Sequence, residues 1–121
     1  MTAERIRRYR EGLWAETLCV LYLRLKGYRI HARRFRTGQG EIDVIAGKGG
    51  VVAFVEVKRR RSRDDALSAV GPKAQARIAR AAMAYIGRNP HLAGRDFRFD
   101  VVAVSPPFGL LHLDNAWTPP S

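Results

Sequence analysis

Residues 40–60, GEIDVIAGKGGVVAFVEVKRR, constrain the fold more than any other part of the chain. Two apolar runs, residues 41–46 and 51–58, are separated by the glycine-rich stretch GKGG. Glycines at such a position supply the positive φ values that a short hairpin loop requires. The segment therefore predicts two antiparallel strands joined by a tight turn.

Three ionisable side chains interrupt the apolar pattern of this hairpin, and they are Asp43, Glu56 and Lys58. Side chains alternate across a strand, so Glu56 and Lys58 share a face, and closure of the hairpin places Asp43 directly or diagonally opposite Glu56. Two carboxylates so close repel each other unless a cation lies between them or one binds a proton. Convergent carboxylate oxygens suit Mg²⁺ or Mn²⁺, and Lys58 adds a positive charge beside the ion.

The N-terminal part of the chain predicts a helix and then a strand. Apolar residues recur at three- and four-residue intervals between residues 2 and 26, which indicates a helix ended by Gly27. We expect the second half of this helix to be mostly buried, and the recurring residues are Leu13, Trp14, Leu18, Leu21 and Leu25. Residues 28–35 alternate as in a half-exposed strand, with Tyr28, Ile30 and Ala32 on one face.

The remainder of the chain predicts a charged loop, a helix and two strands. RRRSRDD, residues 59–65, has the composition of a loop, and Pro72 suits the first turn of a helix through residues 73–86. Residues 97–104 and 110–114 complete the strands, and residues 117–121 are expected to form a flexible tail. The predicted fold is α/β in one domain, residues 1–121, with the order αβββαββ and helices flanking a mixed central sheet.

The charge balance points to a nucleic-acid partner. Lys and Arg number 22 against 11 Asp and Glu, a net charge of +11. Arginine binds phosphates bidentately, which favours nucleic acid, although GC-rich coding also enriches surfaces in arginine. Two groups of basic residues follow the hairpin. The first is a run after its second strand, Arg59, Arg60, Arg61 and Arg63, and the second is a stripe along the next helix, Lys73, Arg77 and Arg80. A solvated loop and an ordinary exposed helix face are the alternative interpretations.

The compartment follows from the cysteine count and the hydropathy. Cys19 is the single cysteine, so no internal disulfide can form, and a reducing cytoplasmic setting is expected. A run of about 18 apolar residues, which a membrane helix needs, does not occur in the sequence. We therefore expect no membrane association.

Glu16 adds a further carboxylate to the predicted helix, among apolar neighbours. An ionised carboxylate on an apolar face is unfavourable unless it is paired, metal-bound or at the edge of the buried stripe. Glu16 can therefore reach the metal through water or lie at a surface edge. Asp43 and Glu56 can likewise pair with arginines such as Arg34 or Arg36 in a purely structural network.

Five segments, taken in order, resemble the uncharacterised bacterial YraN family: EGLWAETLCVLYLRLKGYRI, GEIDVIA, VAFVEVKRR, GPKAQARIARAAMAYI and RFDVVAV. The fold of that family is similar to restriction-endonuclease-like nucleases, especially archaeal Holliday junction resolvases. The resemblance implies that Asp43, Glu56 and Lys58 form a metal-dependent nuclease triad and that Glu16 is the acidic residue on the helix. It also implies that Lys73 or Gln75 approaches the scissile phosphate, and that Arg98 and Asp100 matter.

The resemblance implies an Mg²⁺- or Mn²⁺-dependent endonuclease that hydrolyses phosphodiester bonds, with DNA, and branched DNA in particular, as the expected substrate. A homodimer is a further implied partner, although no patch in the sequence identifies a dimer face. Two alternatives are a non-catalytic nucleic-acid-binding module that keeps the fold and a scaffold in which the charged residues pair only among themselves. Fold alone does not establish cleavage.

Overall fold

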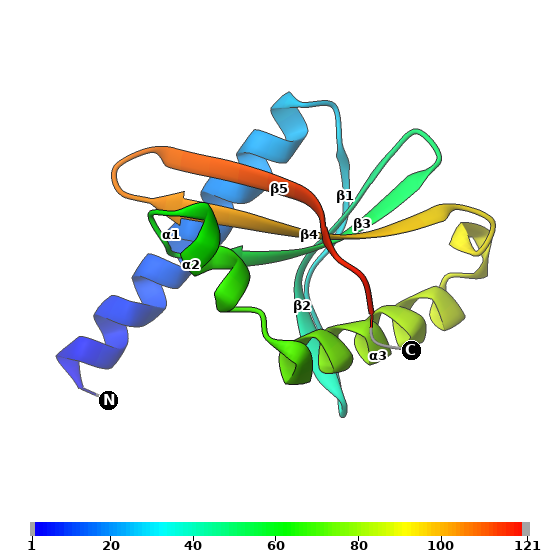
Figure 1. Cartoon of the computed structure of the whole chain (residues 1–121), viewed down its shortest axis with the longest axis horizontal. Coiled ribbons are helices and arrows are strands. Elements are labelled where there is room, and N and C mark those ends of the chain that lie inside the picture. Colours follow the sequence, from blue (N-terminus) through cyan, green and yellow to red (C-terminus); the bar gives the residue numbers. More distant parts are fainter. Residues whose placement is uncertain (1, 120–121) are drawn as a thin grey trace.

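A five-stranded mixed sheet forms the centre of the computed structural model, which describes residues 2–119. The strands lie side by side in chain order (Figure 1), and they are β1 (Arg29–Thr37), β2 (Gly40–Lys48), β3 (Val51–Lys58), β4 (Asp96–Ser105) and β5 (Gly109–Trp117). β3 and β4 are parallel, and the other neighbouring pairs are antiparallel. The predicted mixed sheet of an α/β fold is confirmed.

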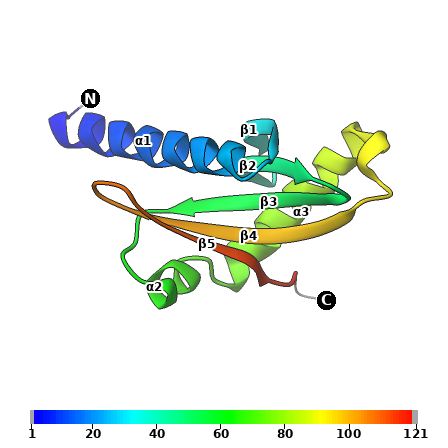
Figure 2. The ribbon, with the colours of Figure 1, turned by 90° about the horizontal axis from the view of Figure 1, so that it is seen from above.

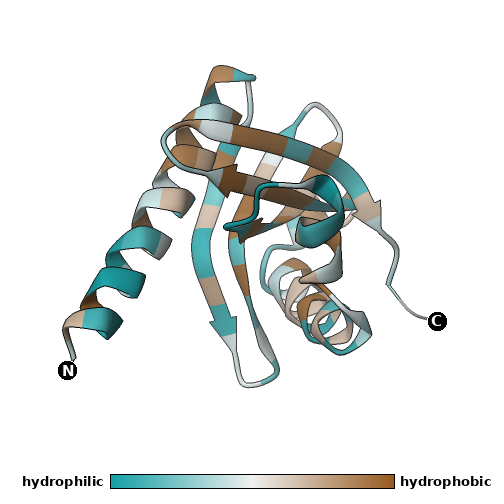
Figure 3. Cartoon of the chain, turned by 60° about the vertical axis from the view of Figure 1, so that its left-hand side comes forward, coloured by the Kyte–Doolittle hydropathy of each residue, from teal (hydrophilic) through white to brown (hydrophobic). Residues whose placement is uncertain are grey.

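Helices cover both faces of the sheet (Figure 2). α1 (Ala3–Leu25) packs on one face, while α3 (Pro72–Arg88) packs on the other, as does the short α2 (Arg63–Ser68). A 3₁₀ turn, Pro90–Leu92, follows α3. Two apolar clusters result, an α1 cluster that contains Cys19 and Val55, and an α3 cluster that contains Phe54 and Ile78. The central strands β3 and β4 contribute residues to both clusters, and they are largely hydrophobic in the colours of Figure 3.

The buried face of α1 differs from the predicted one. The helix begins after Thr2, whose hydroxyl accepts the amide of Arg5, and ends before Gly27 as expected. Its buried residues are Ala15, Glu16, Cys19, Val20 and Leu23, whereas Leu21 and Leu25 are exposed. Neither α1 nor any other helix of residues 2–119 is long and apolar enough to cross a membrane.

β1 does not alternate regularly, because its pairing with β2 shifts between Ile30 and Ala32. The extra residue, His31, turns the following side chains to the other side of the sheet. Ile30 therefore packs in the α1 cluster and Ala32 in the α3 cluster, although the alternation in sequence placed them on one face. Gly47 pairs with Arg29 just before this bulge, and a Cβ atom there would clash with the His31 ring.

The charged segment after β3 is partly helical rather than a loop throughout. Ser62 begins α2 by accepting the amide of Asp65, and Asp64 and Asp65 lie in the first turn, where acidic side chains are favourable. The C-terminal end also differs, since Trp117 ends β5 and stacks on Phe99 with ring centroids 4.3 Å apart. The last residues of the predicted tail, 120–121, lie outside the described part of the chain.

Candidate metal and nucleic-acid site

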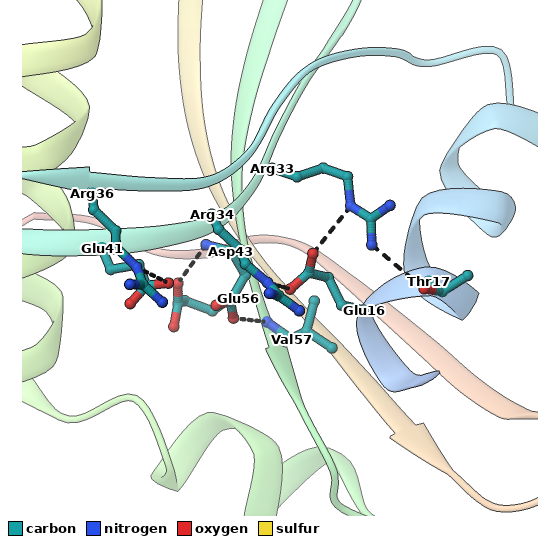
Figure 4. A network of polar contacts seen from close by, with 9 residues as sticks. All are labelled: Glu16, Thr17, Arg33, Arg34, Arg36, Glu41, Asp43, Glu56 and Val57. Carbon is teal, nitrogen blue, oxygen red and sulfur yellow. Dashed lines mark hydrogen bonds and ion pairs between the residues drawn. The ribbon is translucent and has the colours of Figure 1, made fainter. Parts of the chain in front are cut away.

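The ladder between β2 and β3 stops where the two predicted acids begin. The last paired residues of this ladder are Val44 and Val55. At the next position, the carboxylates of Asp43 and Glu56 accept backbone amides in place of backbone carbonyls. The Val57 amide donates to Asp43 Oδ2 at 2.8 Å, and the Asp43 amide donates to Glu56 Oε1 at 3.4 Å (Figure 4). The carboxylates of Asp43 and Glu56, here called the acid pair, therefore lie together at the point where two neighbouring strands part.

A local distortion of β1 and β2 accompanies this separation. Arg34 has a φ of 53°, in the left-handed region that a non-glycine residue rarely adopts. Ile42 and Ile45 both pack in the α3 cluster although they are three residues apart, so β2 changes face between them. Asp43, which lies in this stretch, consequently lines a cavity beside α1. The irregular backbone thus brings the acid from β2 toward the helix that carries Glu16.

Glu56 is buried, Asp43 is half-buried, and neither has a paired cation among the described residues. Burial and the neighbouring Asp43 raise the pKa of Glu56 to about 8. Burial also raises the pKa of Asp43, an effect that the Val57 amide and Lys58 oppose. Within residues 2–119, no salt bridge reaches either carboxylate. Two buried carboxylates in this state bind a proton or attract a cation.

Glu16 is placed near the acid pair but is engaged elsewhere. Its Oε1 accepts Arg33 Nε and its Oε2 accepts Arg34 Nε, both at 3.0 Å. Among the described residues, no group of three His, Cys, Asp or Glu side chains is arranged to hold a metal ion. The structure therefore brings Asp43 and Glu56 together and ties the third predicted acid to two arginines. The arginine pairing considered for the acid pair occurs instead at Glu16 and between Arg36 and Glu41.

A cavity of about 370 Å³ opens beside these residues. Glu16, Asp43 and Lys58 line it. Five arginines and one tyrosine also line it, and they are Arg8, Arg34, Arg36, Arg59, Arg60 and Tyr9. The contributions of Arg8 and Tyr9 were not predicted. A signal was present in the sequence, because Arg8, Gly12 and Glu16 recur every four residues and so share one side of a helix.

The predicted basic run lies partly at this cavity. Arg59 forms an ion pair with Glu11, and the guanidinium of Arg60 donates to the Arg59 carbonyl at 2.9 Å. Arg61 lines an adjacent cavity together with Arg59 and Arg60, and Arg63 is the first residue of α2. All of them are exposed, which suits contact with a large anionic partner.

The predicted stripe on α3 is exposed but does not line the cavity. Lys73, Arg77 and Arg80 point to solvent from a helix on the other face of the sheet. Gln75 is half-buried, and its amide nitrogen donates to the Val70 carbonyl at 3.0 Å, which joins the start of α3 to the end of α2. This bond is a structural contact, and the approach of Gln75 to a scissile phosphate stays a prediction.

Arg98 and Asp100 belong to a separate, buried network. Asp100 has no exposed surface, and it accepts Arg98 Nε at 2.8 Å and the Asn115 amide at 2.9 Å. His112 Nε2 lies 2.8 Å from the same carboxylate, and Arg98 donates to the Tyr28 hydroxyl at 2.6 Å. Burial opposes ionisation of Asp100, but the bonds from His112 and Arg98 lower its pKa. The role of this pair is to join β4 to β5 and β1.

The sequence matches a known but uncharacterised family. A family model described as "Uncharacterised protein family UPF0102" matches residues 15–104, a range that includes the acid pair and Lys58. A UPF0102 protein of Parvibaculum lavamentivorans is 52% identical over 111 residues, which cover 92% of this chain and 84% of the relative. UPF0102 protein RPA0323 of Rhodopseudomonas palustris is 47% identical over 113 residues, 93% of this chain and 87% of the relative. The chain therefore belongs to the UPF0102 family, the YraN family that its motifs indicated.

Proposed function

We propose that this protein is a metal-dependent endonuclease with a restriction-endonuclease-like fold that hydrolyses phosphodiester bonds, with branched DNA as the substrate. The observation that carries the proposal is the acid pair: Glu56 is buried, Asp43 is half-buried beside it, and neither carboxylate has a salt-bridge partner within residues 2–119. A purely structural pair would be expected to have a cation in contact, because two adjacent buried carboxylates are otherwise unfavourable.

The residues of the acid pair fit Mg²⁺ or Mn²⁺. Both ions prefer hard oxygen ligands, and each carboxylate uses only one backbone amide as a partner. When bound, the ion would polarise a phosphate oxygen and lower the pKa of a bound water. Asp43 and Glu56 would hold it. Glu16 would act from further away, through water, because its carboxylate oxygens already accept Arg33 and Arg34.

Lys58 has the role of an electrostatic stabiliser. It lies two residues after Glu56, lines the cavity, and its charge lowers the pKa values of both acids. Its ammonium group can stabilise the negative charge that develops on a phosphate under attack. The guanidinium groups of Arg8 and Arg34 on the same cavity would bind neighbouring phosphates.

The remaining arginines would bind the nucleic acid by charge rather than by base readout. The net charge of +11 and the exposed run of Arg59, Arg60, Arg61 and Arg63 support salt-sensitive contacts with phosphates. A single site cuts one strand, so cleavage of both strands requires two copies of the chain. We include a homodimer in the proposal for that reason, and light scattering in solution tests it.

A non-catalytic nucleic-acid-binding module is the second candidate. The pairing of Glu16 with two arginines, and of Glu41 with Arg36, favours it. Three carboxylates line this cavity, those of Glu16, Glu41 and Asp43, and the pairs leave only Asp43 without an arginine partner among the described residues. The basic surface would then bind nucleic acid while the acid pair shares a proton in place of a metal ion. The two candidates differ in one outcome, which is cleavage.

The deciding experiment incubates the protein with labelled duplex, flap and four-way junction DNA in Mg²⁺, Mn²⁺ or EDTA. Asp43→Asn and Glu56→Gln keep the shape of each side chain and remove its charge. Asp64→Asn is the matched control, since Asp64 is exposed on α2. We expect metal-dependent cutting by the unaltered protein and the control only. Cutting that survives both acid-pair variants contradicts the proposal, and binding without cutting favours the module.

A further inference from the structure

We propose that a second basic pocket, at the opposite end of the β1–β3 ribbon from the acid pair, binds a phosphate group. This distal pocket has a volume of about 380 Å³, and its ionisable lining consists of Arg29, His31, Lys48, His91 and Arg95. Glycines of two turns and Leu92 complete it, and no acidic side chain lines it among the described residues. It lies roughly 13 Å from Asp43, four residues along β2 at about 3.3 Å each.

Three separate parts of the chain converge at this pocket. Arg29 and His31 come from the start of β1, and Lys48 comes from the β2 side of the hairpin turn. His91 and Arg95 come from the segment between α3 and β4. The amide of Asp96 donates to the Gly50 carbonyl at 2.9 Å, which holds that segment against the turn. Figure 2 places the turn and the start of β4 at the same end of the sheet.

The positive charges of the distal pocket lack the partners that arginines have at the acid-pair cavity. Within residues 2–119, Arg29, Lys48 and Arg95 form no salt bridge, whereas Arg33, Arg34, Arg36 and Arg59 each pair with a glutamate. The Lys48 ammonium donates to the Lys26 carbonyl at 2.6 Å, which fixes its position without neutralising it. Unneutralised cations around a concave surface attract anions.

The imidazole of His31 is held in place at the pocket wall. Its Nε2 atom is buried and has no hydrogen-bond partner among the described residues, and the ring rests against Gly47, which has no side chain to displace it. Burial lowers the pKa of His31, and the positive charges of Arg95, Arg29 and His91 lower it further. The positive charge around the pocket thus disfavours protonation of His31, and a bound anion would offset this effect.

Phosphate suits the pocket better than a singly charged anion. Two guanidinium groups can each make paired hydrogen bonds to phosphate oxygens, and imidazole and ammonium groups add further donors. The volume admits inorganic phosphate or one phosphodiester unit. Both sources share the same chemistry, and neither needs the metal or cleavage invoked for the acid pair. Failure of one proposal therefore leaves the other standing.

A titration followed by ¹H–¹⁵N NMR tests this inference on the full chain in EDTA. The probes are inorganic phosphate, a nucleoside monophosphate and a short oligothymidylate. We expect saturable shifts of the Gly47, Lys48 and Gly49 amides and a rise in the pKa of the His31 imidazole. Removing both guanidiniums with Arg29→Ala/Arg95→Ala should weaken binding by about tenfold or more for each group.

The matched control, Arg5→Ala/Arg24→Ala, removes the same charge from two exposed positions of α1 outside the pocket. Saturation by all three probes identifies free phosphate as a ligand, and saturation by the oligonucleotide alone identifies a backbone phosphate; either supports the site. Unsaturable shifts, or equal weakening by the control, would overturn it. Because Arg29 and Arg95 are exposed, the variant should fold, and the dispersion of its spectrum checks this.

Discussion

Replacing Glu56 with glutamine should make the protein more stable at alkaline pH. The pKa of this carboxyl is raised from 4.5 to about 8 by burial and by Asp43, and its side chain is only 9% exposed. The folded chain therefore keeps a proton that the unfolded chain releases between those pH values. The free energy of unfolding falls as pH rises through this window, by roughly 5 kcal/mol for such a difference in pKa. A glutamine at this position does not ionise, so the variant loses this dependence.

Urea unfolding, followed by the fluorescence of Trp14 and Trp117 in EDTA, measures the effect. At pH 5 the variant and the unaltered protein should agree within about 1 kcal/mol, since glutamine resembles a protonated glutamate. At pH 9 the variant should be the more stable by several kcal/mol, up to the roughly 5 kcal/mol above. Glu4→Gln, at an exposed position, should change stability by about 0.5 kcal/mol or less at both pH values.

Metal addition extends the same test. An ion that binds only the folded chain stabilises it, by about 2.7 kcal/mol at a concentration one hundred times its Kd. Mn²⁺ at pH 9 should therefore stabilise the unaltered protein and have little effect on Glu56→Gln. A variant that is less stable than the unaltered protein by the same amount at pH 5 and pH 9 would refute the reasoning about burial.

Three further predictions concern other buried groups. Glu16→Gln removes the negative charge and one of the two acceptor oxygens that Arg33 and Arg34 use, and it should lower the free energy of unfolding by about 1 to 3 kcal/mol in urea; an unchanged value would contradict the pairing. Asp100→Asn should lower the free energy of unfolding by about 3 to 5 kcal/mol, and a lower melting temperature would show this loss. The pKa of Asp100 is lowered in the folded protein, so its contribution to the free energy of unfolding should be fully present above pH 3.8, the ordinary pKa of an aspartate. This contribution should be lost in acid, as the pH falls through the lowered pKa. Burial raises the pKa of Cys19 to about 12, so a thiol reagent at pH 8 should react only after unfolding; rapid reaction with the folded protein would contradict that burial.

Local patterns were sufficient wherever neighbouring residues decide the structure. The GKGG turn joins β2 to β3 as expected, Gly27 follows α1 with a φ of 93°, and Pro72 begins α3. Each depends on backbone preferences of one or two residues, which do not change with tertiary context. The hairpin register follows from the turn, and for that reason the approach of Asp43 to Glu56 was predictable from the sequence.

Local sequence patterns gave wrong predictions where tertiary packing determines which side chains are buried and how the strands pair. Leu21 and Leu25 have the spacing of a buried stripe, yet they are exposed because the sheet contacts the adjacent side of α1. The bulge at His31 is equally invisible to alternation, since it depends on how β1 pairs with β2. α2 was not predicted, because the seven charged and polar residues 59–65 have the composition of a loop. The capping ability of Ser62 was the contrary signal in this segment.

The sequence alone therefore established the membership of the chain in its family, the order of its main elements and the acids of one hairpin, because these depend on residues close together in the chain. Tertiary structure alone decided which charges from distant parts of the chain meet. Glu16 finds Arg34 across 18 positions, and His31 shares a pocket with His91 from a segment beyond α3. Charge interactions depend on distance in space, and only the folded sheet brings these side chains within reach of one another.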